Sequence, residues 1–168
     1  MLYCTECGNK LDVKEIANEG NIPYCPTCDK LFFPKLNLAM IAIVTNDQNQ
    51  ICLVNQKGNG QYKVLIAGYV KPNETLEDCV QREIKEELGI DVKDVHYLNS
   101  YAYENKQVLM VGFHAKAIQT ELNIDPDEIE HAEWYAYHDS VHRIREGSIA
   151  YQLVNQFLEN EAKQNGEK

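Results

Sequence analysis

The sequence predicts an α/β domain preceded by a small cysteine-rich module. From position 36 onward, strand-like apolar runs alternate with segments that repeat their apolar residues at helical spacing. Four of the six cysteines lie within the first 35 residues, where no such periodicity is present. The 168 residues, 44% of them hydrophobic, are enough for one main domain with its own core. We therefore expect a module at residues 1–35, a domain at residues 36–162 and a flexible polar tail at residues 163–168.

The charge balance and the lack of long apolar runs narrow the class of protein. Lysine and arginine number 16 against 26 acidic residues, and the resulting net charge of −10 should repel nucleic-acid backbones. No apolar run approaches the roughly 20 residues of a membrane span, and the first residues do not resemble a signal peptide. We therefore expect a cytoplasmic protein without a nucleic-acid or membrane partner.

The cysteines of the first module form two C-x2-C pairs. Cys4 and Cys7 make the first pair, and Cys25 and Cys28 make the second. A two-residue gap lets both thiolates of a pair face one tetrahedral Zn²⁺, and Gly8 permits the tight turn that this needs. The spacing predicts a structural zinc ribbon. Two disulfides, or a redox C-x-x-C, are the alternatives; the reducing compartment and the presence of two pairs weigh against them.

Six segments after position 36 have strand character. Residues 38–44 form a continuous apolar run that ends at the turn signal Asn46-Asp47, with residues 51–54 as the hairpin partner. Residues 62–70 read as extended, and residues 132–136 read as a short strand rich in aromatic side chains. The remaining two strands are expected at residues 95–103 and 107–117, on either side of a polar turn at residues 104–106.

Two segments have helical character. At residues 75–88, Thr75 can cap the N-terminus, acidic residues favour the helix dipole and Gly89 stops the helix. At residues 149–162, one face is apolar and should pack against the sheet, because its members recur at helical spacing: Ile149, Leu153, Phe157 and Leu158.

The first predicted helix carries an unusual concentration of acidic side chains. Glu83, Glu86 and Glu87 are spaced i, i+3 and i+4 and therefore share one face. Carboxylates fixed beside a core are a hard-oxygen site for Mg²⁺ or Mn²⁺. The alternative is a solvated acidic face. The adjacent stripe should bury itself in the core and so hold the acidic face at its edge; it consists of Leu76, Val80, Ile84 and Leu88.

Residues before this helix add to the metal-site interpretation. Gly68 lacks a side chain, so its backbone carbonyl could approach a metal ion. Glu74 lies next to the cap and within reach of Arg82 if the loop folds back, and such a pair would orient Glu83.

The stretch from Gly68 to Ile90 resembles the Nudix hydrolase signature, G-x5-E-x7-R-E-U-x-E-E-x-G-U with U aliphatic, at every specified position. The resemblance implies an α/β/α sandwich with a mixed sheet and metal-dependent hydrolysis of a diphosphate linkage. Carried over by position, it implies that the divalent metal is held by the Gly68 carbonyl with Glu83, Glu86 and Glu87. One of these glutamates, or another further along the chain, would deprotonate the attacking water.

A four-cysteine module before such a domain resembles the NADH pyrophosphatase branch of this family. That resemblance implies cleavage of NAD(H) to nicotinamide mononucleotide and AMP, and a homodimer. It also implies a metal-binding glutamate after the last long strands, where residues 125–135 fit, so Glu128 is predicted as a fourth carboxylate ligand. The alternative is an ordinary loop glutamate.

Residues 100–108 depart from the branch. Its Ser-Gln-Pro-Trp-Pro-Phe-Pro-x-Ser element is associated with dinucleotide recognition, whereas this chain reads SYAYENKQV and lacks all three prolines. Tyr101 and Tyr103 alternate on a strand and are predicted to stack on a base, with packing against the core as the alternative. The substrate therefore stays open among NAD(H), ADP-ribose, a nucleotide sugar and a nucleoside triphosphate.

Two further departures precede the acidic helix. Asn73 replaces a frequent glycine, and asparagine tolerates a left-handed backbone. Lys71 stands where an acidic residue is common and would alter phosphate binding locally.

Two interpretations from other functional classes fit the sequence less well. A non-catalytic nucleotide-binding regulator should have lost one of the three helix glutamates, and this sequence keeps all of them. A zinc-ribbon nucleic-acid binder should have a basic module, yet residues 1–35 hold four lysines against five acidic residues.

Overall fold

The computed structural model describes residues 2–58, 60–103 and 106–166 of the chain. The chain divides into two compact units, Met1–Leu36 and Asn37–Lys168, and each is considered on its own. Two residues of the predicted turn at 104–106, Glu104 and Asn105, lie outside the described residues, as do positions 167 and 168 of the predicted tail.

The first unit is a three-stranded antiparallel sheet in the order β1-β2-β3. Asn18 and Gly20 adopt positive φ angles of 70° and 75° in the turn between the first two strands, a conformation that both residue types tolerate. These strands were not predicted, because most of their side chains are exposed and no apolar alternation marks them. Their bounds are β1 Asp12–Ile16, β2 Gly20–Cys25 and β3 Lys30–Leu31.

The second unit is built on a mixed sheet in the order β7-β8-β4-β5-β9. Strand β6 lies off this order and pairs with residues 39–42 of β4. Strands β4 and β8 run parallel, and the other pairs are antiparallel, so the predicted mixed sheet is confirmed. The bounds are β4 Asn37–Thr45, β5 Gln50–Gln56, β6 Ile66–Tyr69, β7 Val92–Tyr103, β8 Val108–Ala117 and β9 Ile129–Ala136.

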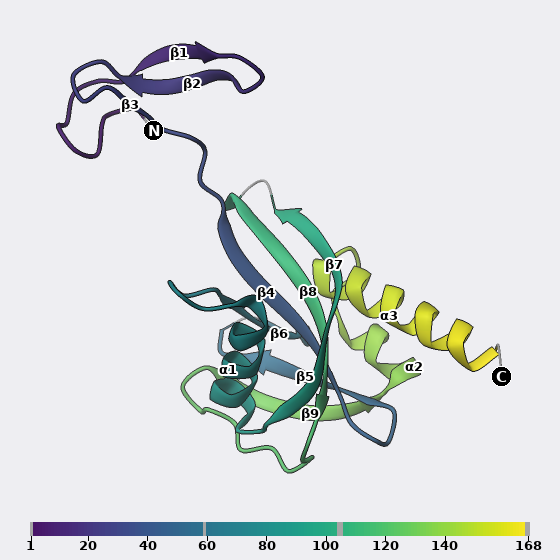
Figure 1. Ribbon diagram of the computed structural model, residues 1–168. Coiled ribbons are helices and arrows are strands. Elements are labelled where there is room, and N and C mark those ends of the chain that lie inside the picture. Colours follow the sequence, from purple (N-terminus) through teal and green to yellow (C-terminus); the bar gives the residue numbers. More distant parts are fainter. Residues whose placement is uncertain (1, 59, 104–105, 167–168) are drawn as a thin grey trace. The chain divides into compact units, whose positions relative to one another are not determined.

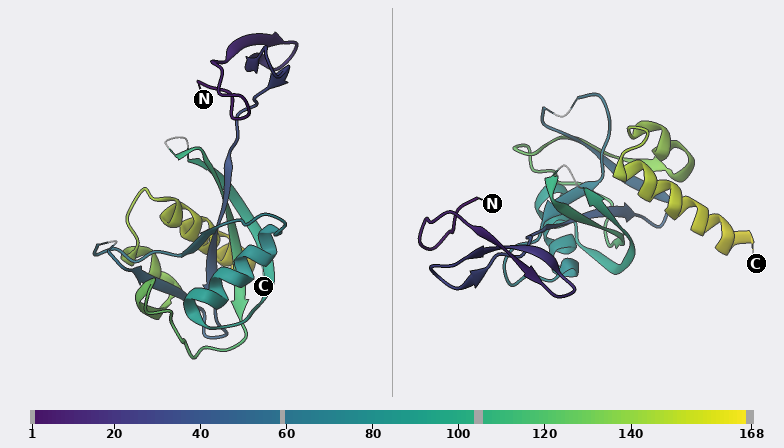
Figure 2. Two further views of the ribbon diagram at one scale, coloured as in Figure 1. Left: turned by 90° about the vertical axis from the view of Figure 1, so that its left-hand side faces the viewer. Right: turned by 90° about the horizontal axis from the view of Figure 1, so that it is seen from above.

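Strand β4 is apolar throughout because both faces of the sheet are covered. Met40, Ala42 and Val44 belong to the core under helix α1, Leu76–Leu88, while Ile41 and Ile43 belong to the core under helix α3, Ile149–Gly166. The two helices lie on opposite faces of the sheet (Figures 1 and 2). The α/β/α sandwich implied by the resemblance is therefore confirmed.

Helix α1 has the predicted ends and the predicted core face. The Thr75 side chain accepts a hydrogen bond from the Asp78 backbone N–H at 3.1 Å, and Gly89 closes the helix with a φ of 70°. Val80, Ile84 and Leu88 are fully buried. Each end of the helix therefore follows from local sequence, and its orientation follows from the apolar stripe.

The C-terminal region departs from prediction in two respects. Helix α3 continues to Gly166, four residues beyond the predicted end at 162. A short helix, α2 at Tyr137–Ser140, and a 3-10 turn, η2 at Val141–Arg143, precede it and were not predicted. Elements of three or four residues are too short to show a hydrophobic period.

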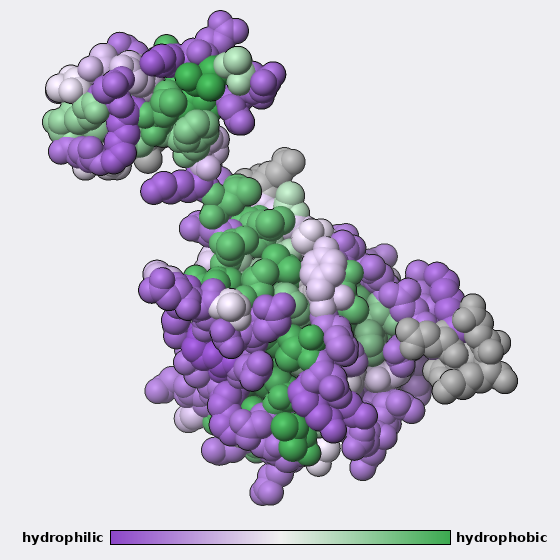
Figure 3. Space-filling view, in the orientation of Figure 1, coloured by the Kyte–Doolittle hydropathy of each residue, from purple (hydrophilic) through white to green (hydrophobic). Residues whose placement is uncertain are grey.

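Polar and charged side chains cover most of the face shown in Figure 3, with a band of apolar side chains over the start of β4, where Leu38 is 44% exposed. In the described part of the chain, no helix combines the length and apolarity needed to cross a membrane.

Candidate active site

The site begins where β6 leaves the sheet and turns into α1. Gly68 pairs with Met40 of β4. In the loop that follows, the Glu74 backbone N–H donates to the Lys71 carbonyl at 3.2 Å and the Lys71 backbone N–H donates to Glu74 Oε2 at 2.8 Å. Asn73 lies between them with a φ of 66°, the left-handed conformation that its type tolerates. The loop is thus a closed turn that directs Glu74 back toward α1.

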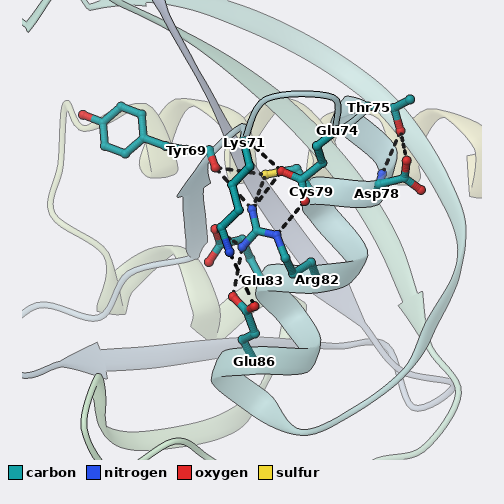
Figure 4. A network of polar contacts seen from close by, with 9 residues as sticks. All are labelled: Tyr69, Lys71, Glu74, Thr75, Asp78, Cys79, Arg82, Glu83 and Glu86. Atoms are coloured by element: carbon teal, nitrogen blue, oxygen red, sulfur yellow. Dashed lines mark hydrogen bonds and ion pairs between the residues drawn. The ribbon is translucent and has the colours of Figure 1, made fainter.

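Arg82 is the centre of a polar network (Figure 4). Its Nε and Nη2 donate to the two carboxylate oxygens of Glu74 at 2.5 and 2.9 Å, and its Nη1 donates to Glu83 at 2.6 Å and Glu86 at 2.9 Å. Nη2 also donates to the Tyr69 carbonyl at 3.2 Å. The hydrogen bonds from Arg82, with help from the Lys71 backbone N–H, lower the pKa of Glu74 to about 2. The Glu74 to Arg82 pair expected from the sequence is present, and it fixes Glu83.

Gly68 is required by the position of Glu83. A Cβ atom on residue 68 would lie 2.1 Å from the Glu83 carboxyl carbon and from Oε1, closer than real contacts allow. From the sequence, the lack of a side chain at Gly68 is expected to let a metal ion approach its backbone carbonyl. The structure gives a further reason, because the Glu83 carboxylate itself occupies the space that a side chain would fill.

Glu87 differs from the other acidic residues of the helix. Its side chain is 2% exposed, and its Oε2 is buried without a hydrogen-bond partner among the described residues. Burial raises the pKa of Glu87 to about 8, with further contributions from the negative charges of Glu83, Glu128, Glu86 and Asp125. An unpaired buried carboxylate costs free energy, so this position demands an explanation.

The loop before β9 brings more acidic groups to Glu87. The Asn123 and Asp125 backbone N–H groups donate to the carbonyls of Leu88 and Glu87, at 2.9 and 3.1 Å, and so anchor the loop to the end of α1. Glu128 follows with an exposed side chain, and its charge acts on Glu87. Asp125 was not predicted as a site residue, although the dense acidic run at positions 125–130 was a signal for it.

The predicted ligands do not yet enclose a cation. Within the described residues, no three carboxylates bring ligand oxygens within 4.8 Å of one another. Glu83 and Glu86 face Arg82 instead, and Glu87 stands apart from that network. The donor set nevertheless fits a divalent metal ion, since carboxylates lie near enough for their charges to act on Glu87, whose buried Oε2 lacks a hydrogen-bond partner among the described residues.

Two adjoining cavities share the lining residues Ala67, Tyr103 and Met110. The larger, about 600 Å³, is on the α3 side of the sheet, and the smaller, about 140 Å³, is lined in part by Gly68. Tyr103 lines both cavities, and the Lys106 ammonium lies 5.4 Å from the centre of its ring. Tyr101 instead packs against the core under α3, with its hydroxyl 3.5 Å from Gln156 Oε1. The two residues predicted to stack on a base therefore differ in their surroundings. Tyr103 lines both cavities, whereas Tyr101 packs against the core.

The four cysteines of the first unit converge. Their sulfur atoms all lie within 4.8 Å of one another, with Cys4 and Cys28 3.9 Å apart and Cys7 and Cys25 3.6 Å apart. A disulfide would need about 2.05 Å. Four thiolates at about 2.3 Å from a tetrahedral zinc ion would lie about 3.8 Å apart, so the observed spacing fits zinc.

Known proteins resemble both the second unit and the chain as a whole. The NUDIX domain family matches residues 35–157. The NAD-capped RNA hydrolase NudC of Pseudomonas putida is 33% identical over 157 residues, which are 93% of this chain and 55% of that protein. The chain thus spans about half the length of the curated relatives it matches.

Solved structures agree on the fold. A NUDIX hydrolase from Nitrosomonas europaea superposes with a TM-score of 0.67 at 18% identity, covering 94% of this chain and 88% of the other. The NUDIX domain of Shewanella oneidensis NrtR, complexed with ADP ribose, gives a TM-score of 0.64 at 19% identity, covering 82% of this chain and 93% of the other. With a family match across residues 35–157 and the signature in place on α1, this chain belongs to the NUDIX hydrolase family.

Proposed function

We propose that this protein hydrolyses the diphosphate linkage of a nucleotide derivative with the help of a divalent metal ion, Mg²⁺ or Mn²⁺. One observation carries the proposal: Glu87 is buried near the end of a NUDIX helix, the charges of further carboxylates act on it, and its Oε2 has no hydrogen-bond partner among the described residues. A bound cation would supply the missing partner and would bring the pKa of this carboxyl back down.

The groups that would hold the metal ion are the carboxylates of Glu83, Glu86 and Glu87, with Glu128 and the Gly68 carbonyl beside them. When bound, a divalent ion neutralises phosphoryl oxygens and lowers the pKa of a bound water. Glu86 is 52% exposed, so its carboxylate can turn from Arg82 without disturbing the core. Arg82 and Glu74 keep the loop and the helix in register.

In the proposed reaction, a water oxygen attacks one phosphorus of the diphosphate and the bridging P–O bond breaks, which leaves two phosphate monoesters. One of the site carboxylates, Glu83, Glu86, Glu87 or Glu128, accepts the proton of that water. The buried position of Glu87 excludes bulk solvent from one side of the reacting groups.

The cavities support a nucleoside as one part of the substrate. The larger is lined mainly by apolar side chains with a few polar groups at its edge, as small-molecule sites usually are. The chain's resemblance to the NADH pyrophosphatase branch favours NAD(H) as the substrate, and ADP-ribose, a nucleotide sugar and a nucleoside triphosphate are the alternatives. The name of the P. putida relative adds NAD-capped RNA, against which the net charge of −10 weighs.

The four-cysteine unit is proposed to bind one structural zinc ion. The convergence of the four sulfur atoms within 4.8 Å of one another supports this assignment. The cysteines are free of disulfides, in keeping with a reducing cytoplasmic setting.

The proposal is tested by a substrate panel with Mg²⁺ or Mn²⁺ in which the products are identified. Wild-type protein, Glu87→Gln and the control Glu77→Gln are compared; Glu77 is an exposed acid on the first turn of the same helix. We expect cleavage of at least one diphosphate compound by wild type and the control, and a loss of at least about 100-fold in Glu87→Gln. Equal rates in all three proteins would refute the assignment.

A further inference from the structure

Arg82 has no hydrogen-bonding capacity left for a ligand. A guanidinium group has five N–H donors. In this site Nε is used by Glu74, Nη1 by Glu83 and Glu86, and Nη2 by Glu74 and the Tyr69 carbonyl. Arg82 therefore organises the carboxylates, and a second cation is needed if a side chain is to contact an anionic substrate.

Lys71 is a cation of a different kind. Its Nζ lies 3.7 Å from Glu86 Oε1, within ion-pair range but beyond hydrogen-bond length. Lys71 and Glu86 are 59% and 52% exposed, and such solvated pairs contribute little. The Lys71 backbone, by contrast, is fixed by Glu74, which hydrogen-bonds to both its N–H and its carbonyl group. Figure 4 shows the result, in which an anchored stem carries its ammonium group over the carboxylates of α1.

The acidic residues around Lys71 determine which ligand its ammonium group can help to bind. The negative charges of Glu83, Glu86, Asp125 and Glu128 act together at the position of Glu87, and such charges repel a phosphate. The nearby Lys85 already has another hydrogen-bond partner, because its Nζ donates to Asp91 at 2.9 Å. Lys71 is thus the cation of the Arg82 network whose three donors are not engaged in hydrogen bonds within the described structure.

We propose that Lys71 binds a phosphate oxygen of the diphosphate substrate. This inference rests on the proposed function and adds a residue to its substrate site. Glu86 Oε1, the oxygen that Arg82 leaves free, is the one that faces Lys71. If Glu86 Oε1 were to hold a divalent ion, the Lys71 ammonium group would lose this partner and be free to contact a phosphate oxygen bound near that ion. Because the exposed Lys71–Glu86 ion pair is weak, breaking it costs little free energy.

The competing explanation is that Lys71 only neutralises Glu86 and competes with the metal ion for it. The two explanations differ in what a neutral side chain at position 71 changes. A phosphate contact predicts weaker binding of a diphosphate, whereas competition predicts tighter binding of the metal ion with no change toward the diphosphate.

The test uses the full chain with ADP as the probe, by calorimetry at saturating Mg²⁺, together with a Mn²⁺ titration followed by electron paramagnetic resonance. The variants are Lys71→Gln and Lys71→Arg, with Lys85→Gln as a control of equal charge change in an exposed ion pair on α1. We expect Lys71→Gln to weaken ADP about tenfold, Lys71→Arg to stay within about threefold of wild type, and Lys85→Gln to match wild type. For a cleaved substrate, KM should rise about tenfold in Lys71→Gln with kcat nearly unchanged.

Unchanged ADP affinity in Lys71→Gln would overturn the inference, and a tenfold gain in Mn²⁺ affinity alongside it would establish the competing explanation. If wild type cleaves a diphosphate compound but the lysine variant behaves like wild type, only the role of Lys71 fails. If wild type cleaves none and binds no ADP, the proposed function fails with it.

Discussion

Replacing Glu87 by glutamine separates the free-energy cost of a buried carboxylate from its proposed use. The pKa of Glu87 is about 8 in the folded protein, against 4.5 for an unperturbed carboxyl. Below pH 4.5 both the folded and the unfolded chain hold this proton. Between pH 4.5 and 8 the unfolded chain releases it while the folded chain retains it, so the free energy of unfolding of the metal-free protein falls as pH rises.

The size of that fall follows from the two pKa values. Each pKa unit corresponds to about 1.4 kcal/mol, so Glu87 destabilises the metal-free fold by about 4 kcal/mol at pH 8 relative to pH 4.5, and by about 5 kcal/mol well above pH 8. Glutamine does not titrate, and the difference between Glu87→Gln and wild type should grow by about 1 kcal/mol per pH unit over this range. Glutamine also introduces an amide that lacks partners, but that term does not vary with pH.

Urea denaturation without added Mg²⁺ or Mn²⁺ measures the difference. The single tryptophan, Trp134, lies in β9 and reports on the second unit by its fluorescence. His114 also titrates, because its burial lowers the pKa to about 4; the unfolded chain therefore binds the extra proton below pH 6.5 and stability falls toward acid. That contribution is common to both proteins and cancels in the difference.

Metal addition provides the second arm of the experiment. At 100 times its dissociation constant, Mn²⁺ should stabilise wild type at pH 8 by about 2.7 kcal/mol. Glu87→Gln should gain less than about 1 kcal/mol under the same conditions. A difference between the two proteins that stays flat from pH 5 to 8, or equal stabilisation of both by Mn²⁺, would refute the reasoning about the buried carboxylate.

Three further predictions concern the neighbours of Glu87 in the site and the separate cysteine unit. Gly68→Ala should lower kcat/KM by about 100-fold, since its Cβ would displace the Glu83 carboxylate; a rate within threefold of wild type would contradict this. Arg82→Lys should lose a similar factor although the charge is kept, because an ammonium group cannot bridge three carboxylates, and restored activity in this variant would argue for charge alone. Cys25→Ser should release about one zinc ion per chain and remove the NMR dispersion of residues 1–36, while Trp134 still reports a folded second unit; retained zinc would show that the cysteine set is wrong.

Much of the second unit could be predicted from the sequence because its signals are local. The apolar run of β4 and the capped, striped helix α1 are each specified by residues within one element. The ribbon strands could not be predicted, because so small a unit buries few side chains and its shape follows from the cysteines. Helix α3 ends later than expected, since its last turn is polar and no glycine or proline stops it before Gly166.

The candidate site was predictable to the extent that it depends on α1 and its loop. Helical spacing places Glu83, Glu86 and Glu87 on one face, and the turn at Asn73 returns Glu74 to Arg82. Spacing alone does not reveal that Glu87 is the buried member of the three. That outcome depends on residues 123–125, which lie more than 30 positions away in sequence and bind the carbonyls at the end of the helix.

The arrangement of charge on α1 explains why the helix tolerates its acidic face. Arg82 offsets the repulsion among Glu74, Glu83 and Glu86, and Lys71 adds a loose second cation to Glu86. If stability alone had shaped this helix, Glu87 would be an apolar residue, since it is buried, as Ile84 and Leu88 are, and its Oε2 has no hydrogen-bond partner among the described residues. A carboxyl with a strongly raised pKa in such a position is typical of a functional site. The buried carboxyl is therefore the part of the structure that a metal ion would complete, and Glu87 is where the proposed chemistry and the stability of the fold are most directly opposed.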